Sequence, residues 1–109
     1  RCGWGNAMYH LLTCDEFDVE EAYRLGFIQE IVEPGNQLER AIAIADAINK
    51  NAPLAIQATK RSSNLYIEKG EQVAFDDFGP SQMRLSQTED FGEGIASFVE
   101  RRAANFRGK

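Results

Sequence analysis

Residues 5–48 read GNAMYHLLTCDEFDVEEAYRLGFIQEIVEPGNQLERAIAIADAI, and this stretch decides the fold because helix and turn signals alternate along it. A helix is predicted over residues 3–13, since apolar residues recur there at helical spacing. A second helix is expected to begin at Asp18, whose side chain can cap the first turn while Glu21 reaches back. Gly26 is expected to end it, because a left-handed residue is favoured there.

The second half of this stretch predicts one strand and one long helix. Residues 27–32 form a short β-like run, which Pro34 and Gly35 bring to an end. Residues 36–51 form the clearest helix of the chain, because Asn36 can cap it and apolar residues follow along one face.

Two more helices are expected in the next part of the chain. One has Pro53 in its first turn and ends at Gly70, and the next begins near Glu71. The dipeptide Gly79-Pro80 is expected to interrupt or kink this second helix, because proline removes a backbone hydrogen bond.

The last helix is predicted to begin at Asp90, with Glu93 completing a capping pattern. The sequence contains no internal repeat and no low-complexity segment. Together the patterns predict a mainly α-helical architecture with one short strand.

The chain has 109 residues, the length of one domain or of a piece of one. It opens with Arg1 rather than methionine, and its first residues already have the pattern of a helix interior. We therefore expect a C-terminal fragment of a longer protein. Its apolar runs are too short to cross a membrane, and no signal-peptide pattern opens the chain, so we expect a cytoplasmic location and no membrane partner.

Charge is distributed unevenly along the chain, which has a net charge of −5. Residues 1–100 hold eight basic and seventeen acidic side chains, whereas residues 101–109 hold no acid and four bases: Arg101, Arg102, Arg107 and Lys109. An acidic surface argues against nucleic acid as a partner. A basic end alone would give only weak, salt-sensitive binding.

Few residues suggest chemistry by themselves. Cys2, Cys14 and His10 match no zinc-binding pattern, so no metal site is predicted and two free thiols are the simpler interpretation. His10 has no nucleophile that can be named as its partner, and a structural or surface role is favoured over a general base. The acidic cluster at residues 15–21 is interpreted as helix capping and solvation.

Phe98 and Arg101 are the one pair that suggests a binding site. Three residues apart on a helix, they would share a face. An aromatic ring can stack on a flat heterocycle while a guanidinium holds a phosphate through forked hydrogen bonds. The alternative is that Phe98 is a core residue and the arginines are a solvated helix end, which the helix dipole also favours.

The order of these segments resembles the C-terminal part of the crotonase superfamily, the enoyl-CoA hydratases and isomerases. The resemblance is carried by residues 5–48, by NAPLAIQATK at 51–60 and by EDFGEGIASFVERRAANFRGK at 89–109, which together make up most of the chain. It implies the helical end of a crotonase-like α/β fold, whose N-terminal spiral of ββα turns supplies oxyanion-hole amides and catalytic glutamates.

That spiral would lie upstream of Arg1, so the resemblance implies no catalytic residue in this chain. It also implies that residues 1–35 end the core region and that residues 36–109 form a C-terminal helical region for oligomerisation. Members of the superfamily are commonly trimers or dimers of trimers. Self-association of this kind is therefore expected.

The activity that the resemblance implies is enoyl-CoA hydration, the addition of water to a 2-enoyl-CoA. Another crotonase reaction, by an isomerase or a thioester hydrolase, is the alternative, as is a non-catalytic module for oligomerisation or CoA contact. A coenzyme A thioester would be the substrate, and no separate cofactor is expected. By position, Phe98 and Arg101 match residues that contact the CoA adenine and 3′-phosphate, often those of a neighbouring subunit.

Two departures from the family pattern stand out. Cys14 replaces the glycine that usually follows Leu-Thr, and it would be strained if the position needs a positive φ. Residues 75–87 form a longer and more broken stretch than the pattern predicts. Because this stretch is implied to lie near the acyl pocket, the acyl preference stays open.

Overall fold

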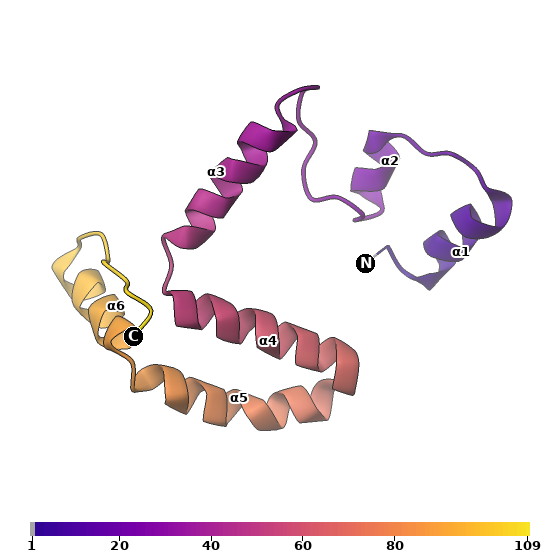
Figure 1. Cartoon of the computed structure of the whole chain (residues 1–109). Helices are drawn as coiled ribbons and strands as arrows, with labels where there is room; N and C mark the ends of the chain where they lie inside the picture. Colours follow the sequence, from indigo (N-terminus) through magenta and orange to yellow (C-terminus); the bar gives the residue numbers. More distant parts are fainter. Residues whose placement is uncertain (1) are drawn as a thin grey trace. The chain divides into compact units, whose positions relative to one another are not determined.

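The computed structural model describes residues 2–109, over which it forms six helices joined by turns and irregular segments (Figure 1). The chain separates into two compact units, divided between Ala41 and Ile42 within helix α3 (Gln37–Asn49). The predicted mainly α-helical architecture is confirmed. Helix α3 begins directly after Asn36, as predicted.

Helix α2 (Val19–Arg24) in the first unit begins and ends where the sequence predicts. The carboxylate of Asp18 accepts a hydrogen bond from the amide of Glu21 at 2.9 Å, which makes Asp18 the N-cap. The chain leaves the helix through Gly26, whose φ of 78° favours glycine. Leu25 is the one apolar side chain of the described chain that is buried.

The strand predicted at residues 27–32 is wrong. These residues form an irregular segment, and no strand occurs anywhere between residues 2 and 109. A strand needs a neighbour to accept its backbone hydrogen bonds. Here the amide of Phe27 bonds instead to the carbonyl of Ala22 at 2.9 Å, and that of Asn36 bonds to Glu33 at 3.1 Å, so both ends of the segment form turns.

Helix α1 (Trp4–Thr13) ends on a left-handed residue that is not glycine. Cys14 has φ 58° and ψ 22°, and its amide donates to the carbonyl of His10 at 3.0 Å. The position therefore requires a positive φ. A residue with a Cβ pays about 1–2 kcal/mol for this conformation, which confirms the expected strain.

The second unit contains helices α4 (Pro53–Lys69), α5 (Glu71–Ser86) and α6 (Glu89–Glu100). Pro53 occupies the first position of α4, and Gly70, with φ 87°, separates α4 from α5, as predicted. Figure 1 shows α4 and α5 side by side as an antiparallel pair. None of the helices described here has the length and apolar character that crossing a bilayer requires.

The expected interruption at Gly79-Pro80 is wrong, because α5 continues through both residues. Proline removes one N–H donor and crowds the carbonyl four residues earlier, and the packing of α5 on α4 offsets this cost. An ion pair reinforces that packing one turn earlier, where Arg61 of α4 approaches Asp77 of α5 at 2.8 Å.

The cap of α6 also differs from the prediction. The helix begins at Glu89, and the hydroxyl of Thr88 accepts a hydrogen bond from the amide of Phe91 at 3.2 Å. Asp90 does not cap the helix, because both of its carboxylate oxygens accept amides from the C-terminal segment.

Replacing Cys14 with glycine tests the strain at the end of α1. We expect Cys14→Gly to raise the free energy of unfolding of the natural protein by about 0.5–1 kcal/mol, since the left-handed penalty outweighs the added flexibility of the unfolded chain. Urea unfolding measures the change. Cys14→Ala is the matched control, because it removes the thiol but keeps the Cβ, and a gain as large as that of glycine would contradict backbone strain.

Candidate functional site

Phe98 and Arg101 lie at the end of α6, but not on one helical face. Phe98 is in the last turn and is 85% exposed, so it is no core side chain of the described chain. Arg101 follows the last helical residue, Glu100, and has φ 55° and ψ 42°. The helical spacing that predicted a shared face therefore does not apply, because the helix ends between the two residues.

The backbone makes a tight reversal at this point. The amide of Arg101 donates to the carbonyl of Phe98 at 3.4 Å, and that of Arg102 donates to Ser97 at 3.1 Å. This pattern is the usual helix ending in which a left-handed residue, most often glycine, satisfies the last carbonyls. The C-terminal segment, residues 103–109, then runs back along α6 (Figure 1).

Arg102 is bound within the chain by two carboxylates of α6. Its two terminal nitrogens donate to the two oxygens of Glu93, at 2.5 and 2.8 Å, and its Nε donates to Glu100 at 2.6 Å. Glu93 also accepts the amide of Asn105 at 2.7 Å. A forked pair of this kind has a defined geometry, unlike a single surface contact.

These contacts shift the acid–base equilibria of both partners. Hydrogen bonds from Arg102 and from the amide of Asn105 lower the pKa of Glu93 to about 2. The same carboxylate, together with Glu100, raises the pKa of Arg102 above its ordinary value. Both groups are therefore charged at neutral pH.

Asp90 holds the end of the C-terminal segment. It is 3% exposed, and its oxygens accept the amides of Arg107 and Gly108 at 2.6 and 2.7 Å. Its own amide donates to the carbonyl of Lys109 at 3.1 Å. A buried carboxylate is stable here because two donors satisfy it at the positive end of a helix.

The structure thus separates basic side chains that the sequence groups together. Arg102 is engaged in ion pairs with Glu93 and Glu100, whereas the exposed Arg101 has no ion-pair partner among residues 2–109. Arg101 is therefore free to bind an anion. The sequence does not indicate that Asp90, Glu93 and Arg102 hold the C-terminal segment, because the spacing of Asp90 and Glu93 is typical of a helix cap.

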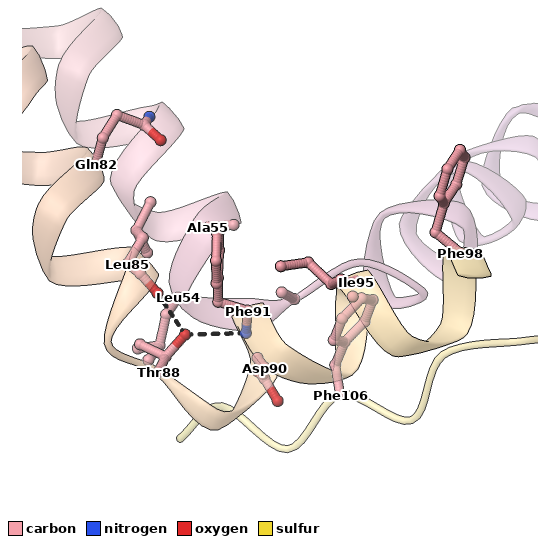
Figure 2. A pocket seen from close by; sticks show the side chains of 12 residues that line it. Leu54, Ala55, Gln82, Leu85, Thr88, Asp90, Phe91, Ile95, Phe98 and Phe106 are labelled. Carbon is pink, nitrogen blue, oxygen red and sulfur yellow. Dashed lines mark hydrogen bonds between the residues drawn. The ribbon is translucent and has the colours of Figure 1, made fainter. Parts of the chain in front are cut away.

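An apolar cavity of about 490 Å³ lies beside Phe98 within the second unit. Figure 2 shows its wall on α6, formed by Phe91, Ile95 and Phe98, together with Phe106 from the C-terminal segment. Phe106 packs closely on the helix, because a Cβ at Gly94 would lie 3.7 Å from its ring. Helices α4 and α5 contribute Leu54, Ala55, Gln82 and Leu85 to the lining.

The other candidate residues lie in the first unit. His10 contacts the rings of Tyr9 and Phe17, with centroids 5.1 and 4.5 Å away, in keeping with a structural role. Cys2 and Cys14 are free thiols. Between residues 2 and 109 no group of three or more potential ligands is placed to hold a metal ion.

A comparison of the whole chain with protein families gives one assignment. The model of the family described as Enoyl-CoA hydratase/isomerase matches residues 1–109. The chain belongs to the enoyl-CoA hydratase/isomerase family. This confirms the resemblance to the crotonase superfamily, and it explains the helical fold as one part of that larger architecture.

Relatives and solved structures agree with this assignment. The chain is 38% identical over 106 residues to (E)-benzylidenesuccinyl-CoA hydratase of Thauera aromatica, covering 94% of this chain and 40% of the relative. It is 32% identical to crotonyl-CoA hydratase of Syntrophomonas wolfei, over 98% of this chain and 41% of the relative. A probable enoyl-CoA hydratase/isomerase from Mycobacterium abscessus superposes with a TM-score of 0.95 at 42% identity, over 99% of this chain and 42% of that one. The chain thus spans about two fifths of the length of these proteins.

The lowered pKa of Glu93 predicts a pH dependence of stability. A carboxylate whose folded pKa lies near 2 instead of 4.5 stabilises the fold above pH 4.5, and this contribution is lost as the pH falls from there through 2. In the natural protein, Glu93→Gln is therefore expected to be less stable than wild type at pH 6, with the gap closing towards pH 2. Denaturant unfolding on a pH series measures this, and parallel curves for the two proteins would contradict it.

Proposed function

We propose that the natural protein carrying these residues is an enoyl-CoA hydratase, which adds water to a 2-enoyl-CoA. The observation that carries this proposal is the family match along the whole chain, joined by relatives that are named hydratases of CoA thioesters. An isomerase or a thioester hydrolase of the same superfamily is the alternative, because the helical part of the fold does not contain the reacting groups.

In this proposal the chain contributes binding rather than chemistry. Phe98 supplies an exposed ring on which an adenine can stack, and Arg101, three residues later, supplies an unpaired guanidinium for the 3′-phosphate. The ligand is the CoA end of the substrate, bound in the same subunit or a neighbouring one. Backbone amides and glutamates outside these residues would stabilise the enolate and move protons.

We further propose that residues 36–109 serve self-association, as a trimer or a dimer of trimers, in the cytoplasm. Support comes from α6, where Phe91, Ile95 and Val99 remain 48%, 54% and 73% exposed although they recur at helical spacing. An apolar helix face of this kind needs a covering surface. Another copy of the protein is the occupant that a closed symmetric oligomer would supply.

Hydration of a short enoyl-CoA tests the proposed activity. We expect the purified natural protein to consume crotonyl-CoA and to release 3-hydroxybutyryl-CoA without free CoA, because water adds across the double bond and the thioester stays intact. Loss of the enoyl absorbance and chromatography of the products measure this. Release of free CoA would indicate a thioester hydrolase, and movement of the double bond without hydration would indicate an isomerase.

Truncation of the proposed CoA contacts tests the binding role. Phe98→Ala and Arg101→Ala are each expected to raise KM for the enoyl-CoA about tenfold with little change in kcat, since a lost charged hydrogen bond or stacking contact is worth roughly 1–3 kcal/mol. Steady-state kinetics measures both constants. Lys69→Ala is the control, because it removes an exposed charge at the end of α4 instead. Wild-type KM in both variants would show that the assignment of these residues is wrong.

A further inference from the structure

Arg101 is held in a conformation that its side chain disfavours. Among the described residues that are not glycine, only Cys14 and Arg101 have positive φ. The left-handed region costs such a residue about 1–2 kcal/mol, and glycine would relieve this cost at Arg101. Contacts elsewhere must therefore fix the reversal, since an unsupported turn would lower its energy by relaxing.

The supporting contacts come from the residue that follows. Arg102 binds Glu93 through both terminal nitrogens, and Glu93 lies slightly more than two helical turns before Arg101. The pair joins the far side of the reversal to the body of the helix. Because the forked contact defines both distance and orientation, it restricts how the chain can turn at Arg101.

A second set of contacts holds the end of the C-terminal segment. Asp90 binds the amides of Arg107 and Gly108, and its own amide binds the carbonyl of Lys109. Gly108 also lies against the first turn of α4, since a Cβ there would be 3.6 Å from the Cβ of Pro53. The segment is thus fixed at both ends, by Glu93 near the reversal and by Asp90 at the terminus.

We infer that Glu93, Arg102 and Asp90 are positioning residues for CoA binding: they fix the reversal that keeps Arg101 unpaired and presents it with Phe98 to the ligand. This inference rests on the proposed role of Arg101 and Phe98. It assigns the two neighbouring arginines different tasks, since Arg102 locks the turn and Arg101 binds the 3′-phosphate. It also accounts for two acidic side chains beside a site that should attract an anion, because both are engaged by internal donors.

The experiment measures binding of CoA and of 3′-dephospho-CoA to the natural protein by calorimetry, because the two ligands differ only in the phosphate assigned to Arg101. Wild type is expected to prefer CoA about tenfold or more, the value of one charged hydrogen bond. Glu93→Gln preserves size and the acceptor for Asn105, but it removes the charge that binds Arg102. We expect this variant to lose about 3–10-fold in CoA affinity while 3′-dephospho-CoA changes less than about twofold, since a displaced guanidinium loses only its own contact.

Two further variants separate positioning from general damage. Arg102→Lys keeps the charge but not the fork, and it should reduce the preference for CoA as Glu93→Gln does. In an Arg101→Ala background, Glu93→Gln should cause no further loss of CoA affinity, because the side chain it positions is gone. Glu30→Gln is the matched control, since it breaks a similar exposed pair with Arg40, 2.7 Å apart, in the other unit.

The possible results are distinct. An unchanged preference for CoA in both Glu93→Gln and Arg102→Lys would overturn the positioning inference but not the role of Arg101. Equal weakening of both ligands, or additive losses with Arg101→Ala, would also overturn it, because either result indicates a structural role. A wild-type protein without any preference for CoA would overturn the role of Arg101 itself, and the positioning inference would fall with it.

Discussion

The carboxylate of Asp90 is the contact on which the C-terminal part of the second unit depends. It lies in the first turn of α6, is nearly inaccessible to solvent, and binds the backbone at Arg107 and Gly108. Two amide donors replace the water that the Asp90 carboxylate loses on burial, so its hydrogen bonding stays satisfied. The dipole at the N-terminus of α6 also stabilises the negative charge. Without these hydrogen bonds, the last residues would be held along the helix by the Glu93 contacts and by apolar packing at Phe106 and Gly108. The position of Phe106 on Gly94, and with it one wall of the apolar cavity, follows from the same return path.

Local signals in the sequence predicted the helices well, and they failed where the outcome depends on distant partners. Asp18, Pro53 and Gly70 act within one or two turns, so their roles at helix ends follow from the sequence alone. The run at residues 27–32 has β-like composition, but a strand exists only with a neighbour, and none lies in the described chain. Asp90 looked like a cap for the same reason: its true partners lie seventeen and eighteen residues away.

The geometry at the candidate site could not be predicted from the sequence. An aromatic and a basic residue three positions apart suggested a pair on one helical face, yet the helix ends at Glu100 and Arg101 turns left-handed. Sequence spacing cannot reveal this ending, because arginine is a poor candidate for a conformation that favours glycine. The contacts that stabilise it join Arg102 to Glu93, nine residues earlier. Two adjacent arginines therefore have different environments, although composition alone treats them as equivalent.

The distribution of apolar side chains limits what these residues can do by themselves. Leu25 is the only buried apolar side chain between residues 2 and 109, while every helix presents exposed apolar positions. Burial of such side chains is worth about 1.5–3 kcal/mol each, so the helices obtain little of the stabilisation that their pattern is built to provide. Backbone hydrogen bonds, caps and ion pairs define the local structure, but they contribute modestly to net stability. The apolar faces are therefore available to further surfaces, and the proposed self-association would supply one. The candidate site at the end of α6 lies beside exposed apolar side chains. Ligand sites often lie where two protein surfaces meet, which fits the proposed binding of the CoA end of the substrate there.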